Sequence, residues 1–401
     1  MLSPEERFLP LGRTYFGDED DPATECHCNL WDWDQLRLIK IKGTSKFFPP
    51  EDDAQTSIFA QYLDYLSPEV REITIDNDGL LTGIPTDPDV DETEFTAYMP
   101  CSLCNHLANS PTICFSQLRE IDRLGPGVDL LSYNDQKVIF KFNPLRLPHK
   151  LNSSWREMNI ISKLPSHPNL VPFDNLILED NESRIIGFTT KYIPGGTLSD
   201  PNKPFRFEWL QQLTQLVDFL NFELGIMHQD IAPRNLLMDP ETEEILLFNF
   251  DCAAGGQRGL LKGQDDVTGI VFTLHEIITN DPQIKKIPHW KRKIHMVQNI
   301  EWTCNRELDC DVSKFRQFLN DWITNRSNGS MERYLNAPKR ITWPAFQDPP
   351  DFDVPFQFGK NAAGEAVFRS GERYRSSALK NGQYCFQWQR PPQRRRPGVP
   401  L

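Results

Sequence analysis

The order of two hydrophobic periodicities between residues 113 and 325 is the feature that most constrains the fold of this chain. Patterns typical of strands come first, with one helix among them, and two long amphipathic helices follow. This order, strands before helices, predicts an α+β domain. The strand patterns include KVIFKF (137–142) and RIIGFTTKYI (184–193), and the helical patterns lie at 149–164, 207–228 and 265–281.

The acidic charge of the chain is concentrated at its N-terminal end. Residues 1–113 carry 22 acidic and 7 basic residues, a balance of −15, whereas the remaining residues carry +2. We therefore expect no nucleic acid as the main ligand, because phosphate backbones require a basic footprint. The basic C-terminal tail, which ends in RPPQRRRPGVPL, is interpreted as a solvated tail rather than a nucleic-acid or localisation patch.

The apolar stretches indicate no secretory signal and no membrane span. Nine cysteines in such a chain are typical of reduced thiols, so we expect an intracellular protein, cytoplasmic or nuclear, with no membrane partner. Cys101, Cys104 and His106 could supply three zinc ligands, with a fourth from CHC (26–28). Structural zinc sites usually combine two closely spaced pairs of ligands, and only one such pair is present at Cys101 and Cys104. The interpretation that these residues bind no zinc is therefore favoured.

Residues 1–112 show no repeat and no clear domain pattern, and we expect a partly irregular N-terminal region there. SIFAQYLDYL (57–66) has the spacing of a helix, and REITID (71–76) alternates like a strand. The segment 76–94 is acidic and rich in Pro and Gly, which predicts a loop or linker.

HQDIAPRN (228–235) has a spacing suited to chemistry. Its Asp can accept a hydroxyl proton, and the Asn five residues later can hold a metal ion. The stretch resembles the catalytic loop of protein kinases, H-R-D-x-x-x-x-N, which implies that Asp230 is the catalytic base and Asn235 a magnesium ligand. Arg234 matches the tyrosine-kinase-like form of this loop. Gln229 replaces the Arg that usually pairs with a phosphorylated activation loop, so we do not expect such regulation.

The resemblance extends upstream to a Lys and a Glu. KVIFKF matches the V-A-I-K strand of the family, which implies that Lys141 binds the α- and β-phosphates of ATP. The two-residue period places Ile139 and Lys141 on one face, toward the nucleotide. Glu157 matches the helix Glu that pairs with this Lys. Alternatively, Glu157 closes a capping box in SWRE, unless Pro148 begins the helix earlier and leaves Glu157 in its middle.

TTKYIPGGTL (189–198) resembles the strand and hinge that link the two kinase lobes. The resemblance implies that Thr190 is the gatekeeper and that the backbone of Lys191, Tyr192 and Ile193 binds adenine.

LGPGVDLL (124–131) resembles an incomplete glycine-rich loop. It supplies Gly125 and Gly127, but Leu130 stands where the third Gly is expected. Alone, this pattern also fits any hairpin turn, and its position before Lys141 favours the loop.

FNFD (248–251) departs from the D-F-G motif of the family. Asn249 stands at the position of the magnesium-binding Asp, and Asp251 stands at the position of the Gly. An amide oxygen holds a hard cation less firmly than a carboxylate does. Magnesium binding is therefore weakened, or Asp251 replaces the missing carboxylate, or catalysis is lost.

Asp266 opens a stretch that resembles the helix whose Asp anchors the catalytic loop. Only the residues 250–265 separate it from Asn249, and they contain no A-P-E-like anchor. This interval leaves little room for an activation loop and a peptide platform.

The resemblance implies a two-lobed kinase fold at 113–325, with a small β-rich lobe, a larger helical lobe, and extensions at 1–112 and 326–401. The whole is similar to divergent kinase-like proteins of filamentous fungi. Three functions stay open: an ATP- and magnesium-dependent kinase for Ser, Thr or Tyr, a pseudokinase that binds nucleotide or a partner, and a small-molecule kinase similar to aminoglycoside or choline kinases. Four C-terminal aromatic residues are expected to pack on the large lobe: Trp343, Phe346, Phe386 and Trp388.

Overall fold

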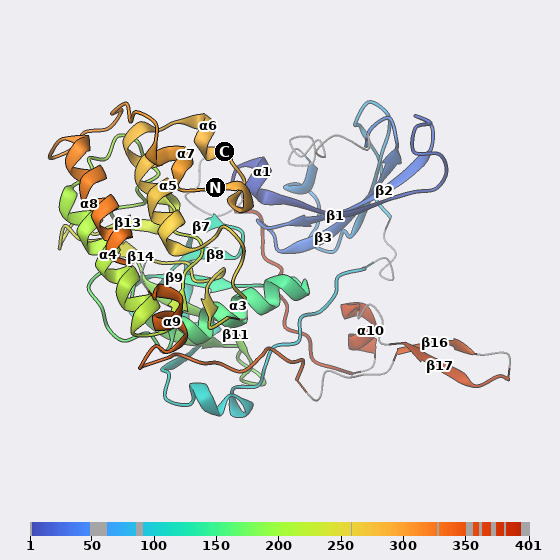
Figure 1. Cartoon of the computed structure of the whole chain (residues 1–401). Helices are drawn as coiled ribbons and strands as arrows, with labels where there is room; N and C mark the ends of the chain where they lie inside the picture. The colour runs from blue at the N-terminus through green and yellow to red at the C-terminus, as the bar shows by residue number, and fades with distance from the viewer. Residues whose placement is uncertain are drawn as a thin grey trace.

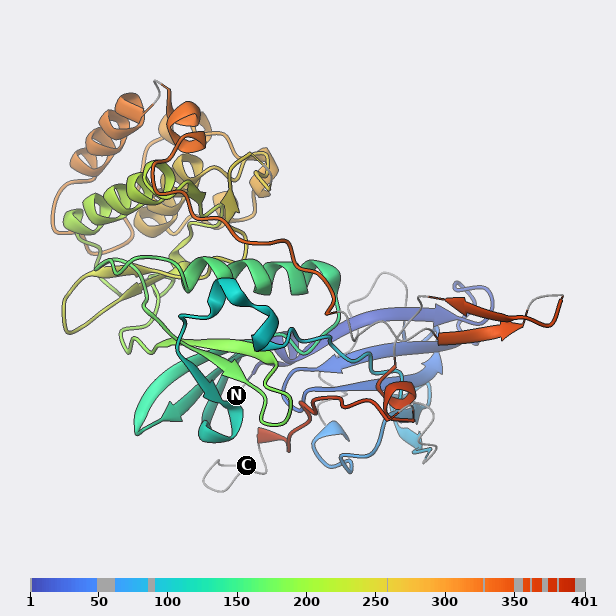
Figure 2. The same ribbon diagram turned by 90° about the horizontal axis from the view of Figure 1, so that it is seen from below.

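The computed structural model contains two large β-sheets, three two-stranded sheets and a helical lobe (Figure 1). The helical lobe and the N-terminal sheet lie on opposite sides, with the second sheet between them (Figures 1 and 2). This arrangement confirms the predicted α+β class and the two-lobed fold. The described residues are 2–48, 62–85, 91–257, 259–326, 329–349, 356–360, 363–369, 374–380 and 382–393.

The N-terminal region forms a five-stranded sheet in the order β1-β2-β3-β4-β5. Neighbouring strands are antiparallel except β3 and β4, which are parallel. REITID is a strand, as predicted, and a short strand interrupts the expected loop at 76–94. The first half of the helical pattern at 57–66 lies outside the described residues, and in the second half residues 62 and 63 are helical. The elements are α1 Pro4–Arg7, β1 Phe8–Tyr15, β2 Glu25–Asp32, β3 Arg37–Thr44, β4 Glu72–Ile75 and β5 Leu81–Gly83.

This sheet is more regular than the partly irregular region that the sequence predicted. Part of its core consists of cysteines, which pack here as apolar side chains. Cys26, Cys28 and Leu30 alternate along β2 and are fully buried against Ile39 and Ile41 of β3. Burial raises the pKa of the Cys28 thiol to about 11, as expected for a packed, neutral side chain.

The zinc candidates do not assemble into a site. Within the described chain, Cys101, Cys104 and His106 do not form a group of three potential ligand atoms within 4.8 Å. Cys104 is buried in an apolar cluster with Trp155, and the His106 ring makes an edge contact with the same indole. These side chains have a packing role here.

The second sheet is the small lobe. Its strand order is β6-β10-β11-β9-β8-β7, and α3 packs against β11 through Trp155, Met158 and Ile161. Short 3-10 turns precede it at Cys101–Leu103 and Asn105–Leu107, and a third lies at Phe115–Gln117. The elements are β6 Thr112–Cys114, β7 Arg119–Gly125, β8 Val128–Tyr133, β9 Gln136–Phe142, α3 Pro148–Ile161, β10 Phe173–Leu178 and β11 Ile185–Lys191.

The large lobe is built around α4 and α5, which share a core with α8. No helix in the described residues is long and apolar enough to cross a membrane. The elements are α4 Phe207–Phe222, β12 Ile226–Met227, η5 Pro233–Asn235, β13 Leu236–Met238, β14 Ile245–Leu247, β15 Ala254–Gly255, α5 Asp266–Thr279, α6 Pro282–Lys285, η6 His289–Lys291, α7 His295–Gln298, α8 Val312–Arg326 and α9 Ser330–Leu335.

The C-terminal extension returns to the small lobe. It includes β16 Phe356–Lys360, β17 Ala366–Arg369 and α10 Arg375–Lys380, and the basic tail from 394 lies outside the described residues.

The expected packing of the C-terminal aromatics on the large lobe is wrong for three of the four residues. Trp343 contacts the large-lobe core, but Phe346 packs on the α3 residue Trp155. Trp388 stacks on Phe142 with ring centroids 4.6 Å apart, and Phe386 packs beside it. The reason is β9, whose face opposite Lys141 presents aromatic rings that the extension covers.

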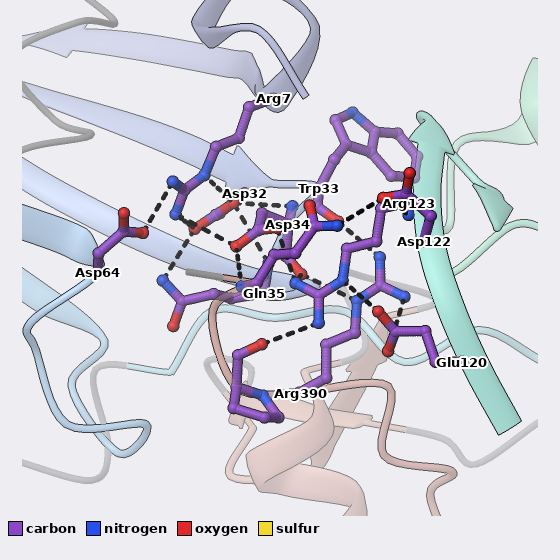
Figure 3. A network of polar contacts seen from close by, with 12 residues as sticks. Arg7, Asp32, Trp33, Asp34, Gln35, Asp64, Glu120, Asp122, Arg123 and Arg390 are labelled. Carbon is purple, nitrogen blue, oxygen red and sulfur yellow. Dashed lines mark hydrogen bonds and ion pairs between the residues drawn. The ribbon is translucent and has the colours of Figure 1, made fainter. Parts of the chain in front are cut away.

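A buried polar network joins the N-terminal sheet, the small lobe and the C-terminal extension (Figure 3). Arg123 of β7 is its centre, with a side chain only 1% exposed. Its Nη1 lies 2.7 Å from Asp34 Oδ1, and its Nη2 donates to the carbonyl oxygen of Pro391 at 2.9 Å. Arg390 donates from Nε to the carbonyl oxygen of Asp34 and pairs with Asp129 of β8. Three distant segments therefore meet at one charge cluster.

We predict that Arg123→Ala lowers the free energy of unfolding by about 3–5 kcal/mol, because it leaves buried Asp34 without its main cationic partner. The denaturant midpoint measures this loss. Arg119→Ala, an exposed arginine on the same strand, is the control and should change the midpoint little. Equal effects of the two substitutions would contradict the role given to the network.

Candidate nucleotide and phosphotransfer site

Lys141 and Glu157 form an ion pair between β9 and α3. Lys141 Nζ lies 2.6 Å from Glu157 Oε1, and both side chains are largely buried. Helix α3 begins at Pro148 after Leu147 as N-cap, so Glu157 lies in its second half. The capping-box alternative for Glu157 is therefore wrong. Ile139 shares the face of β9 that carries Lys141, as the two-residue period predicts.

Asn249 is tied to this ion pair. Lys141 Nζ donates to Asn249 Oδ1 at 2.8 Å, and the N–H of Phe250 donates to Glu157 Oε1 at 3.0 Å. Asn249 has φ +69°, a left-handed conformation that Asn adopts more readily than most residues. The amide oxygen that would replace a metal-binding carboxylate is therefore already engaged by an ammonium group.

Asp230 lies in the catalytic loop with two local partners. Arg234 Nη2 is 2.5 Å from Asp230 Oδ1, and Asn235 Nδ2 donates to Asp230 Oδ2 at 2.7 Å. Asn249 Nδ2 approaches Asn235 Oδ1 at 3.4 Å. The structure thus brings Asp230, Arg234 and Asn235 together and joins them to the Lys141 group through Asn249.

Asp251 supplies a second carboxylate next to Asp230. Asp230, Asp251 and Cys252 each place a potential ligand atom within 4.8 Å of the others, and no other such group occurs in the described chain. Asp251 Oδ1 is buried without a hydrogen-bond partner, as expected for an atom that awaits a cation. Burial, reinforced by the charges of Asp251 and Asp230, raises the pKa of the Cys252 thiol to about 12. A neutral thiol is a poor ligand for a hard cation, so the two carboxylates fit magnesium better.

Asp266 anchors the catalytic loop from the start of α5. It is 1% exposed, and its carboxylate accepts hydrogen bonds from the backbone N–H groups of His228 at 2.9 Å and Gln229 at 2.8 Å. Asn221 of α4 donates to it at 2.8 Å. Burial raises the pKa of Asp266, while His228 and these donors act in the opposite direction.

Gln229 has a structural role that the sequence did not reveal. Its backbone has φ +63°, and its side chain is almost fully buried. Nε2 donates to the carbonyl oxygens of Cys252 at 2.8 Å and Gly259 at 2.9 Å, while Oε1 accepts from the N–H of Leu261 at 2.6 Å. One neutral amide thus holds the short segment before α5. The only signal in the sequence was the exchange of Arg for Gln.

The predicted hinge lies at the end of β11. Thr190 is buried opposite Ile139 of β9, and Lys191 N–H donates to Pro172 O at 3.1 Å. Tyr192 is half-buried, and Ile193 packs in a small apolar cluster.

The predicted glycine-rich loop is the tight turn between β7 and β8, with Gly125 paired to Val128. Gly127 has φ +70°, and a Cβ there would lie 2.4 Å from Phe142 O. Only Gly fits this turn, because both the backbone conformation and the close approach exclude a side chain.

A cavity of about 190 Å³ adjoins Lys141 on the α3 side. Lys141, Glu157, Asn249 and Asp251 line it, together with side chains from outside the predicted kinase region, namely Trp33, Tyr98 and Phe346. The hinge residues do not line it. The sequence missed this cavity because its walls come from three separate parts of the chain.

Comparisons with known proteins find partial matches. No protein-family model matches the chain. Over 123 residues, the chain is 28% identical to casein kinase II subunit alpha' of Saccharomyces cerevisiae, which covers 30% of this chain and 35% of that protein. It is 31% identical over 124 residues to CBL-interacting protein kinase 12 of Oryza sativa subsp. japonica, 29% of this chain and 21% of that one. CBL-interacting serine/threonine-protein kinase 5 of Arabidopsis thaliana is 28% identical over 133 residues, which cover 32% of this chain and 28% of that protein. The chain thus spans about a third or less of each curated relative.

We predict that Gln229→Ala destabilises the chain by about 1–3 kcal/mol and speeds amide exchange at Leu261, because two carbonyls and one N–H lose their partner. Hydrogen-exchange mass spectrometry over 252–261 measures the effect. Gln229→Glu should restore only part of the protection, since a carboxylate can accept from the N–H of Leu261 but cannot donate to the carbonyl oxygens of Cys252 and Gly259. The exposed residue Gln283 offers the control, Gln283→Ala. Unchanged exchange in Gln229→Ala would exclude this role.

Proposed function

Because this chain belongs to the protein-kinase-like superfamily, we propose that it is an ATP-dependent phosphotransferase that acts on a Ser, Thr or Tyr hydroxyl of a protein. The observation that carries this proposal is the half-buried carboxylate of Asp251, whose buried Oδ1 has no hydrogen-bond partner and which lies in one cluster with Asp230. It offers the charge that Asn249 lacks.

Each residue has a role in this proposal. Asp230 accepts the proton as the acceptor oxygen bonds to the γ-phosphorus and the bond to ADP breaks. Arg234 holds the Asp230 carboxylate in place. Lys141, oriented by Glu157, binds the α- and β-phosphates.

Magnesium would be held by Asp251 and the amide oxygen of Asn235, with Asn249 as a weaker neighbour. When bound, the ion neutralises charge on the phosphates. The adenine would lie between Ile139 and the hinge residues Thr190, Lys191, Tyr192 and Ile193, and Gly125 and Gly127 would cover the phosphates.

A pseudokinase is the second candidate, and one contact favours it. Asn249 Oδ1 accepts a hydrogen bond from Lys141 Nζ at 2.8 Å. Asn249 therefore adds no negative charge to the metal site, and it engages the ammonium group that would bind the phosphates. In this alternative, the cleft binds nucleotide or a partner without transfer.

We expect saturating Mg-ATP to raise the melting temperature, since a ligand at 100 times its Kd stabilises by about 2.7 kcal/mol. Asp251→Asn should remove the magnesium-dependent part of this shift and leave the shift caused by ATP alone. Asn249→Asp should raise magnesium affinity or activity, because it adds a carboxylate to the cluster.

Radiolabelled transfer to mixed peptide acceptors separates the two candidates. The enzyme should transfer phosphate, and Asp230→Asn should abolish transfer while leaving the thermal shift intact. A shift without transfer to any peptide supports the pseudokinase, and transfer to small-molecule acceptors alone would identify a small-molecule kinase. The absence of any shift with or without magnesium would refute both nucleotide-dependent functions.

A further inference from the structure

A strongly basic stretch lies beside the catalytic loop. The sequence KKIPHWKRKIH, residues 285–295, has five Lys or Arg and two His in eleven residues, and it has no acidic residue. Without these five bases, residues 114–401 hold 31 basic and 34 acidic residues, a balance of −3. This stretch, named the basic segment below, is therefore a local reversal of charge.

The basic segment packs against the short segment that precedes α5. A Cβ on Gly263 would lie 2.6 Å from the carbonyl oxygen of His289 and 3.2 Å from Trp290 Cα, so the two backbones are in direct contact. Gly263 has φ +77°, which permits this approach. Gln229 of the catalytic loop holds the same short segment, so the basic segment packs against residues that contact this loop.

Two basic residues of this segment are close enough to Asp230 to sense its charge. Burial is the main cause that lowers the pKa of His289 and of Arg292, and the charge of Asp230 opposes the change in both. Arg234 acts on the same two residues. Arg292 is held rigidly, with its guanidinium 5.0 Å from the Phe272 ring centroid and Nε donating to the carbonyl oxygen of Ile287.

The outer face of the segment combines positive charge with exposed apolar surface. Trp290 is 67% exposed, and Leu261 across the contact is 53% exposed. Lys285 pairs with Glu276, but Lys291 and Lys293 lie farther than 4.0 Å from every described carboxylate. An exposed Trp flanked by uncompensated lysines is a favourable anchor for a binding partner.

We propose that the basic segment is the docking surface for the acceptor, and that the acceptor is an acidic peptide segment whose hydroxyl is flanked by Asp or Glu. This inference rests on the proposed phosphotransfer function and names its substrate class. Charge complementarity supports it, because the five bases of the segment attract an acidic peptide, whereas the N-terminal region, which carries −15, repels it. A long polyanion such as RNA fits less well, since the charge reversal spans eleven residues of an acidic chain.

The test measures binding of three fluorescent peptides to the full chain by anisotropy, without ATP. The peptides share a central Ser and differ in their flanks, which are Glu and Asp, Gln, or Lys. We expect the acidic peptide to bind at least about tenfold more tightly than the Gln peptide, with affinity that falls as salt rises.

Two double variants locate the surface. Lys291→Gln with Lys293→Gln should weaken the acidic peptide about three- to tenfold. The control removes the same charge elsewhere, by Lys46→Gln in the turn after β3 and Lys314→Gln on α8, and should leave binding unchanged. Trp290→Ala should weaken binding of the acidic peptide as well.

Different results separate this inference from the proposed function. Binding of the acidic peptide without phosphate transfer would leave the docking surface standing and refute catalysis. Transfer to the Gln peptide as efficient as to the acidic one would refute the docking surface and leave catalysis standing. Equal weakening by the two double variants, or tighter binding of a single-stranded RNA of matched charge, would also overturn the inference.

Discussion

The buried carboxylate of Asp266 is the interaction on which the rest of the site depends. It accepts the N–H groups of His228 and Gln229, and so stabilises a left-handed residue that would otherwise be strained. That conformation presents Asp230 on one side and sends the Gln229 side chain to the segment before α5 on the other. A single anchor thus orients the proposed base and the floor of the proposed acceptor site.

The parts of the site that were predictable from the sequence are those set by local spacing. Asn235 follows Asp230 by five positions, and the strand period determines the face of Lys141, so short-range geometry is sufficient. The pairing of Lys141 with Glu157 required only that a helix begin at Pro148. The role of Cys26 and Cys28 was harder to predict, because a cysteine can be either a metal ligand or a small core residue. Only their burial between neighbouring strands distinguishes the two roles.

Contacts between segments that are distant in the sequence could not be predicted from it. The proximity of Asp251 to Asp230 depends on the backbone path after Asn249, which has a left-handed conformation that no residue pattern specifies. The walls of the cavity beside Lys141 likewise come from residues more than 300 positions apart, Trp33 and Phe346. The same holds for Trp388, whose place on Phe142 depends on how the chain returns after α9.

The contacts of Arg123 cross both boundaries of the predicted kinase-like region. Arg123 lies within the predicted kinase-like region, 113–325, yet its guanidinium pairs with Asp34 and donates to the carbonyl oxygen of Pro391, both outside that region. An excised region 113–325 would leave Arg123 paired with Glu120 but without Asp34, and would uncover the aromatic face of β9. The flanking regions therefore complete the packing of the small lobe.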